Sequence, residues 1–143
     1  MYKKILVGVD GSESSKKACE VAVELAKKLG SELIIATIYS APTIPIGDVP
    51  PYPPTVPKEV EEKLKVMLKE LEDYARKEGV KAESKILPVW ATPGAGLVVE
   101  ADRLGCALIV IGSRGLTGIK RALIGSVADY VVKNSGCSVL IVR

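Results

Sequence analysis

The chain has 143 residues and a mass of 15.2 kDa, which fits one domain spanning residues 1–143 and leaves no room for two. It contains no histidine, which excludes Ser-His-Asp and Cys-His nucleophile systems and His-ligated zinc or iron sites. The net charge of +3 is too small to predict binding to nucleic acid.

The cysteines and the apolar segments bear on location. Cys19, Cys106 and Cys137 lie far apart without C-x-x-C spacing, which disfavours a structural zinc or a dithiol redox motif. An odd number of cysteines suits the reducing cytosol. The apolar run near the N-terminus stops at Asp10, too early for a signal peptide, and no stretch approaches the length of a membrane span. We therefore expect a cytoplasmic protein without a membrane segment.

Short apolar runs alternate with segments of helical periodicity along the whole chain. In chain order the pattern predicts strand Lys3–Asp10, helix Ser12–Gly30, strand Glu32–Tyr39, helix Pro57–Gly79, strand Lys81–Val89, helix Thr92–Gly105, strand Cys106–Gly112, helix Ser126–Gly136 and strand Ser138–Arg143. Each helix ends at a glycine, and most strands are continuously apolar, as strands covered on both faces are. This alternation predicts a doubly wound α/β fold with right-handed crossovers.

Seven of the nine prolines lie between Pro42 and Pro57. Proline cannot donate to a strand ladder or sit inside a helix, so the connection at about 40–57 is predicted to be an exposed, partly extended loop. We favour a surface insertion over a binding lid. Trp90, the single tryptophan, is expected to pack at the end of a strand.

The segment from Ile111 to Val127 (IGSRGLTGIKRALIGSV) follows a predicted buried strand and leads into a helix. Its glycines let the backbone approach a ligand, and a helix N-terminus adds oriented N–H groups. Arg114, Lys120 and Arg121 add positive charge. The segment therefore outlines a phosphate site, although the glycines alone equally fit a long strand-to-helix connection.

The spacing favours the phosphate site. Gly112, Gly115, Gly125 and Ser126 form G-x2-G-x9-G-S, which is neither a Walker motif nor G-x-G-x-x-G. Together with the Val9-Asp10-Gly11-Ser12 turn and the terminal CSVLIVR run, the spacing resembles the ATP-binding branch of the universal stress protein family over the whole chain.

The resemblance implies a three-layer, Rossmann-like sandwich of the adenine nucleotide alpha hydrolase-like kind, with a five-stranded parallel sheet in the order 3-2-1-4-5. The first and fourth strands are then neighbours where the winding direction reverses, and ligands of such sheets bind at that point. Asp10 and Gly112, each predicted to end one of these strands, are expected to meet at a single crevice.

The resemblance also implies roles for individual residues. Val9 and Asp10 are expected against the nucleoside, with the Asp10 carboxylate near the ribose or the metal, and Ile38 against adenine. Gly112, Arg114 and Gly115 are expected around the ribose and phosphates. Gly125, Ser126 and the Val127 amide are expected to hold the phosphate tail, and a Mg²⁺ ion is expected to be bound mainly by phosphates and water. No catalytic residue and no protein-held metal ion is assigned.

Two positions depart from the family pattern, and one of the site residues has a second interpretation. Ala91 stands where the family often has glycine before a residue-Pro pair, and Thr37 stands where it often has histidine. The added methyl of Ala91 is expected to narrow the adenine pocket. Without the glycine motif, Asp10 would be interpreted as a turn former or helix cap.

Three hypotheses for function follow from these features. The first is an ATP-binding regulatory protein of the stress response that works through nucleotide-dependent conformation or partners. The second is a slow ATPase at the same site, for which Asp10 and Arg114 are the plausible catalytic groups. The third is a dimeric scaffold without nucleotide. The terminal strand Ser138–Arg143, an apolar sheet edge without proline, predicts a homodimer, as does the resemblance.

Overall fold

The computed structural model describes residues 1–42, 47, 49–114 and 124–143. Strands and helices alternate in the predicted order: β1 (Lys4–Gly8), α1 (Glu13–Leu29), β2 (Glu32–Ser40), α2 (Lys58–Lys77), β3 (Ala82–Val89), α3 (Pro93–Leu104), β4 (Leu108–Gly112), α4 (Ser126–Asn134) and β5 (Ser138–Val142).

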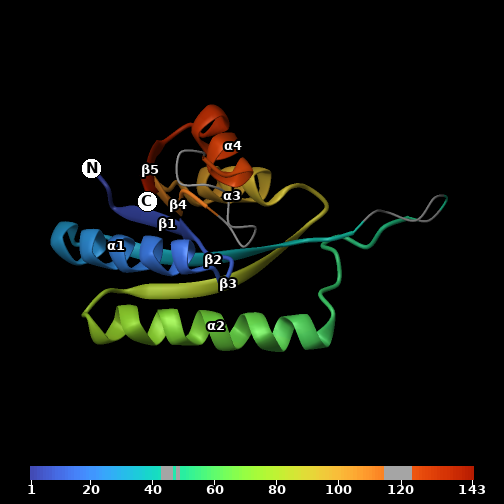
Figure 1. Cartoon of the computed structure of the whole chain (residues 1–143), viewed down its shortest axis with the longest axis horizontal. Coiled ribbons are helices and arrows are strands. Elements are labelled where there is room, and N and C mark those ends of the chain that lie inside the picture. Colours follow the sequence, from blue (N-terminus) through green and yellow to red (C-terminus); the bar gives the residue numbers. More distant parts are fainter. Residues whose placement is uncertain (43–46, 48, 115–123) are drawn as a thin grey trace.

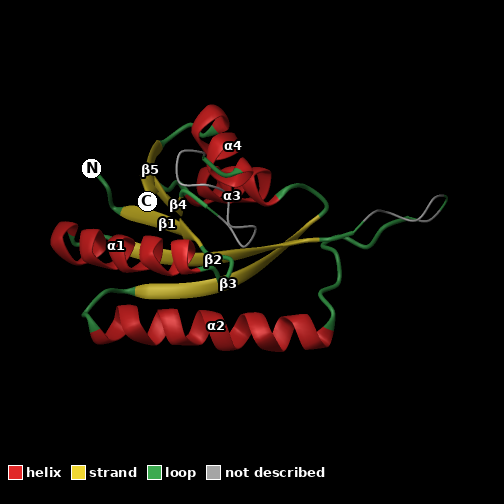
Figure 2. Ribbon diagram, viewed as in Figure 1, coloured by secondary structure: helices red, strands yellow, loops and turns green. Residues whose placement is uncertain are grey.

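The five strands form one parallel sheet in the order β3-β2-β1-β4-β5, as predicted (Figure 1). The central strand β1 pairs Ile5 with Leu33 of β2 on one side and with Leu108 of β4 on the other. Helices α1 and α2 cover one face of the sheet, and α3 and α4 cover the other (Figure 2). The prediction of a three-layer α/β sandwich is therefore confirmed.

Burial on both faces explains why the central strands are continuously apolar. In β1, Ile5 and Val7 pack under α1, whereas Leu6 packs under α3 and α4, and all three are fully buried. An alternating polar position would place an unpaired polar group in one of the two cores, which costs free energy. The same constraint holds for Ile109 and Val110 of β4, which are also fully buried.

The predicted strand boundaries differ from the structure where hydrogen bonds of neighbouring turns intervene. β4 begins at Leu108 and not at Cys106, because the Cys106 N–H donates to the Ala101 carbonyl and so closes α3. β1 ends at Gly8, two residues before Asp10, although the Val9 N–H still donates to the Ala36 carbonyl at 2.9 Å.

Helix ends follow the predicted signals at α1 and α3. Gly30 and Gly105 occupy the left-handed region, with φ of 67° and 68°, which favours glycine. The glycine stop predicted for α4 at Gly136 is wrong. Helix α4 ends at Asn134 and is followed by Ser135 in an extended conformation, whose hydroxyl accepts a hydrogen bond from the Cys137 N–H at 3.2 Å. The serine side chain thus closes the turn.

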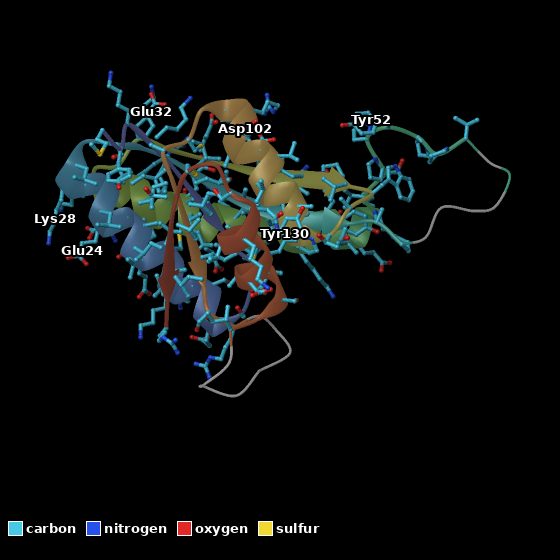
Figure 3. The ribbon with its side chains drawn as sticks, turned by 90° about the horizontal axis from the view of Figure 1, so that it is seen from above. Glu24, Lys28, Glu32, Tyr52, Asp102 and Tyr130 are labelled. Carbon is cyan, nitrogen blue, oxygen red and sulfur yellow. The ribbon has the colours of Figure 1, made fainter. Side chains whose placement is uncertain are left out.

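The described part of the proline-rich connection has neither helix nor strand after Ser40 and extends away from the sheet (Figure 1). Tyr52 is 90% exposed and lies far from the helices (Figure 3). The connection is tied to the sheet by the indole N–H of Trp90, which donates to the Pro51 carbonyl at 2.9 Å. Trp90 directly follows β3, so it holds the connection at the end of that strand.

Glu100 is a buried carboxylate that joins α3 to the sheet. It accepts hydrogen bonds from Lys85 of β3 at 3.3 Å and from Arg103 Nε at 3.2 Å. Burial acts to raise the pKa of Glu100, but the hydrogen bonds from Arg103 and Lys85 outweigh it, so the pKa lies below its usual value.

We expect Glu100→Gln to lower the free energy of unfolding by about 1–3 kcal/mol near neutral pH, because it removes charge-assisted hydrogen bonds from a buried site. The pKa of Glu100 is lower in the folded chain than in the unfolded chain. The stability that its charge contributes is therefore complete above the unfolded pKa and is lost as the pH falls through the folded value. Urea titrations across that range measure the difference between variant and wild type, which should shrink on acidification.

Glu24→Gln is the matched control for this measurement. Glu24 lies on the exposed side of α1, 3.1 Å from Lys28 four residues on (Figure 3). An exposed pair of this kind contributes less than about 1 kcal/mol. Equal losses at Glu24 and Glu100 would contradict the role given to the buried carboxylate.

Candidate functional site

A cavity of about 250 Å³ opens at the carboxyl ends of β1 and β4, where the strand order reverses. This is the position at which open parallel sheets bind ligands. The lining residues come from the ends of β1, β2 and β4, from the starts of α1, α3 and α4, and from the adjoining turns: Gly8, Val9, Asp10, Ser15, Ala36, Ile38, Pro93, Leu97, Ile111, Gly112, Ser113, Arg114, Gly125, Ser126, Val127 and Ala128.

The predicted site residues gather around this cavity. Those that line it are Val9, Asp10, Ile38, Gly112, Arg114, Gly125, Ser126 and Val127. The remaining predicted residue, Gly115, lies outside the described residues, as do Lys120 and Arg121. Residues from opposite ends of the chain are thus brought together by the sheet order.

One end of the cavity is apolar. Ile38 and Ala36 of β2, Leu97 of α3 and Ile111 of β4 contribute to it. Ala36, Leu97 and Ile111 belong to the core cluster under α3 and α4, and the partly buried Ile38 packs against that cluster. Such a surface suits a flat, weakly polar group such as a nucleobase.

Asp10 forms the turn that the sequence offered as one interpretation, and it also lies at the cavity. Its carboxylate Oδ1 accepts a hydrogen bond from the Ser12 N–H at 2.9 Å, which forms a local turn before α1. Its own N–H donates to Ser15 Oγ at 3.2 Å. Asp10 is nevertheless exposed and lines the cavity. The turn therefore fixes the position of a carboxylate at the cavity.

Gly112 is required by packing whether or not a ligand binds. A methyl group at Gly112 would lie 2.9 Å from the carbonyl carbon and oxygen of Ser14 in α1, closer than such atoms approach each other. The hydroxyl of Ser14 also accepts a hydrogen bond from the Arg114 N–H at 3.3 Å. The start of α1 is thus held against the end of β4, which brings Asp10 and Arg114 to the same cavity.

The two ends of the glycine segment are joined directly. The Gly125 N–H donates to the Ser113 carbonyl at 2.7 Å, and the Ser113 N–H donates to the Val142 carbonyl of β5 at 2.9 Å. This pair of hydrogen bonds fixes the start of α4 beside the end of β4.

Helix α4 begins at the cavity, and no side chain at its N-cap residue, Gly125, forms a capping hydrogen bond. At α1 and α3 a side-chain oxygen of Ser12 or Thr92 accepts a hydrogen bond from a first-turn N–H. The corresponding residue of α4 is Gly125, which has no side chain to do so. The first N–H groups of a helix lack intrahelical partners and carry a partial positive charge, so this end of the cavity suits an anion.

The charged side chains at the cavity also favour an anionic ligand. Arg114 is exposed at the cavity and has no carboxylate within ion-pair distance in the part of the chain that the structure describes. Asp10 is the one acidic side chain among the lining residues that the structure describes. The polar end therefore combines one cation and helix N–H groups with one carboxylate.

Several residues that line the cavity were not predicted from the sequence. Ser15 is buried, and its hydroxyl donates to the Ser12 carbonyl at 3.0 Å, but in sequence it is one of several serines near a helix start. For Leu97, the sequence pattern predicted only a place in the buried apolar stripe of a helix. The expected narrowing by Ala91 is not seen, because Ala91 is exposed and does not line the cavity. Trp90 is also absent from the lining.

A second hollow lies between α2 and β3, beside Leu68 and Ile86. Its lysines already have acidic partners, since Lys65 lies 2.7 Å from Glu61 and Lys69 lies 3.1 Å from Asp73. Across residues 1–42, 47, 49–114 and 124–143, no group of three or more His, Cys, Asp or Glu side chains is arranged to hold a metal ion.

Comparison with known proteins places the chain in a family. The model of the universal stress protein family matches residues 1–143. The chain is 36% identical to universal stress protein YxiE of Bacillus subtilis, with both chains covered completely. It is 33% identical to a universal stress protein of Methanocaldococcus jannaschii, covering all of this chain and 83% of that one.

Solved structures agree with the sequence matches. Universal stress protein UspA from Lactobacillus plantarum superposes with a TM-score of 0.83 at 20% identity, covering 99% of this chain and 98% of that one. A universal stress protein solved in complex with cAMP superposes with a TM-score of 0.74 at 31% identity, covering 99% and 97%. With the sheet order and the spaced glycines, these matches show that the chain belongs to the universal stress protein family.

Proposed function

We propose that the chain binds an adenine nucleotide, with ATP as the ligand, and acts as a stress-response regulator through nucleotide-dependent conformation or partner binding. The observation that carries the proposal is one cavity lined both by apolar side chains such as Ile38 and by Arg114 and the first turn of α4, whose N-cap residue Gly125 provides no capping side chain. A nucleotide likewise has a weakly polar base at one end and anionic phosphates at the other. The 31% identical relative solved with cAMP supports an adenine base.

We propose that the base, the ribose and the phosphates of ATP lie one after another along the cavity. The base lies against Ile38, and the ribose lies beside Val9 and Asp10. Gly112 and Arg114 lie beside the ribose and phosphates, and Gly125, Ser126 and the Val127 amide hold the phosphate tail; the same role proposed for Gly115 rests on the glycine spacing alone. The cavity volume of about 250 Å³ is smaller than the roughly 300–1,000 Å³ of pockets that enclose a whole small ligand. The phosphates are therefore expected to lie at the rim over α4.

A Mg²⁺ ion fits this site as a companion of the phosphates. Magnesium prefers oxygen ligands and retains several water molecules. Within the described part of the chain, Asp10 provides the one carboxylate that lines the cavity, and its Oδ1 accepts a hydrogen bond from the Ser12 N–H. We propose that phosphate oxygens and water supply most of the coordination, and that the ion neutralises phosphate charge near Asp10.

Binding without efficient turnover is the favoured activity. Hydrolysis of ATP needs a group that orients or deprotonates water and groups that stabilise the transferred phosphoryl. The chain has no histidine, and among the described residues that line the cavity only Asp10 and Arg114 carry ionisable side chains. A slow ATPase at the same site is the second candidate.

Ser126→Asp tests the phosphate end of the site. An acidic residue is favourable in the first turn of a helix, so the variant should fold normally. Its carboxylate would repel the phosphates within a few ångströms, and we expect ATP affinity to fall about 100-fold by isothermal titration calorimetry. Ser126→Asn keeps the helix N–H groups and is expected to lose less than about tenfold. Equal affinities of the two variants for ATP would contradict the assignment.

Turnover separates the two candidate functions. Protein loaded with radiolabelled ATP and Mg²⁺ is expected to retain intact ATP in a single-turnover assay over several minutes. Release of phosphate on that timescale, abolished by Asp10→Ala, would establish the slow ATPase. Nucleotide that co-purifies with the protein, identified by mass spectrometry, reports binding independently of turnover.

We also propose that two copies associate through β5. The two edges of the sheet differ in character. The edge strand β3 carries Glu83, Lys85 and Pro88, which discourage pairing with another strand, whereas β5 presents Val139, Leu140 and Ile141 in succession. Antiparallel pairing of two β5 strands about a two-fold axis would cover this edge.

Leu140→Lys is expected to shift the protein from dimer to monomer in size-exclusion chromatography with light scattering. Two-fold pairing brings the central residues of both strands close together, so the variant places like charges across the interface. Glu83→Lys adds the same side chain to the opposite edge and should leave the dimer intact. A monomeric wild type, or a dimeric Leu140→Lys variant with an unchanged unfolding midpoint, would overturn this proposal.

The helices and the cysteines bear on where the protein is located in the cell. None of the helices in the described ranges has the length and apolar character needed to cross a bilayer. Cys19, Cys106 and Cys137 are free thiols, and burial raises the pKa of Cys19 to about 12 and of Cys106 to about 11. Free thiols, two of them buried with raised pKa values, suit the reducing cytoplasm. We propose a cytoplasmic location without a nucleic-acid partner.

A further inference from the structure

Helix α3 begins Pro93-Gly94-Ala95-Gly96, with two glycines in its first turn. Neither glycine has a positive φ, so the backbone at both positions accepts alanine. Glycine within a helix costs about 0.8–1 kcal/mol relative to alanine. The reason for glycine at these positions therefore lies in what a side chain would touch.

A side chain at Gly96 would press on a residue that lines the cavity. An added Cβ would lie 3.1 Å from Cγ2 and 3.2 Å from Cδ1 of Ile38 in β2, and 3.5 Å from Cγ1 of Val89. The two contacts with Ile38 are closer than ordinary van der Waals separation, so Ile38 would have to shift by a few tenths of an ångström. Ile38 is one of the residues that line the cavity. A methyl group at Gly96 would therefore displace a side chain of the cavity wall.

A similar close contact would arise between β1 and α3 if Gly8 carried a side chain. An added Cβ at Gly8 would lie 2.7 Å from Cδ1 of Leu97. Leu97 is the large side chain that α3 contributes to the same end of the cavity. Each of these two apolar side chains thus rests against a glycine on a neighbouring element, and the width of the apolar end depends on those glycines.

Gly94, in the same helix turn, serves as the control position for Gly96. An added Cβ there would lie 3.0 Å from Cβ of Tyr130 on α4, the helix that packs beside α3 (Figure 3). Neither Gly94 nor Tyr130 lines the cavity. Gly94 and Gly96 thus share a helix turn and a similarly close contact, but only the contact of Gly96 involves a cavity residue.

We propose that Gly96 is a positioning residue that sets the size of base the site accepts. Without a side chain at this position, Ile38 stays against α3 and the apolar end remains wide enough for a two-ring purine. This inference rests on the proposed function, because it concerns the base of the nucleotide. One methylene in an apolar pocket changes discrimination by about 10–200-fold.

The test compares ATP with CTP, whose base has one ring, by calorimetry on the full-length chain. Gly96→Ala is expected to lower the ratio of ATP affinity to CTP affinity by about tenfold. Gly94→Ala, which disturbs the contact with α4, is expected to leave that ratio unchanged even if both affinities fall. In an Ile38→Ala background, Gly96→Ala should have no effect on the ratio, because the two Ile38 atoms that it would crowd are absent and the remaining neighbour, Cγ1 of Val89, lies at ordinary contact distance.

Each result bears on a distinct claim. A wild type that binds neither nucleotide overturns the proposed function. A wild type that binds ATP, with an unchanged ATP-to-CTP ratio in folded Gly96→Ala, overturns only the role of Gly96. If Gly96→Ala does not fold, Gly96→Ala with Ile38→Val takes its place, because valine lacks the Cδ1 contact but retains the contact through Cγ2. The ratio is then expected to fall relative to the Ile38→Val single variant, and an unchanged ratio between these two variants overturns the inference.

Discussion

The contact between Ser14 and Gly112 is the constraint on which the site depends. These residues lie 98 positions apart in the chain, and the backbone of α1 approaches β4 so closely that no side chain fits between them. The approach brings the turn containing Asp10 to the segment containing Arg114, and it is reinforced by the hydrogen bond from the Arg114 N–H to Ser14 Oγ. A wider separation would leave a carboxylate and a cation on two unrelated surfaces. Gly112 is therefore best understood as a packing residue that makes a ligand site available.

The fold was largely predictable because both of its signals are local. Continuous apolar runs mark strands covered on two faces, and the 3.6-residue stripes mark the helices between them. The strand order came from the family resemblance and not from periodicity, since no local signal states which strands are neighbours. The errors occurred at boundaries. Cys106 was assigned to a strand, but its N–H completes the preceding helix, and Ser135 performs the closure expected of Gly136.

The candidate site was predictable where motif and topology coincide, at Asp10, Gly112 and the start of α4. It was not predictable where a residue reaches the cavity through tertiary packing alone. Leu97 and Ser15 have ordinary sequence contexts, and their place at the cavity follows from how closely α3 and α1 approach the sheet. Glycines were recognised as loop formers or helix stops, yet Gly8 and Gly96 lie inside regular elements. Their role is visible only in the atoms that a methyl group would meet.

The uncapped start of α4 also connects the two proposed surfaces of the molecule. A phosphate bound there would take the place of the capping side chain that Gly125 lacks, so the ligand itself would complete the helix. Helix α4 has nine residues, and only the segment 135–137 separates it from β5, with Ser135 bridging to the Cys137 backbone. At its carboxyl end, β5 in turn receives the hydrogen bond from Ser113 at the cavity. The helix that meets the anion and the strand that forms the sheet edge are consecutive parts of one short, hydrogen-bonded unit.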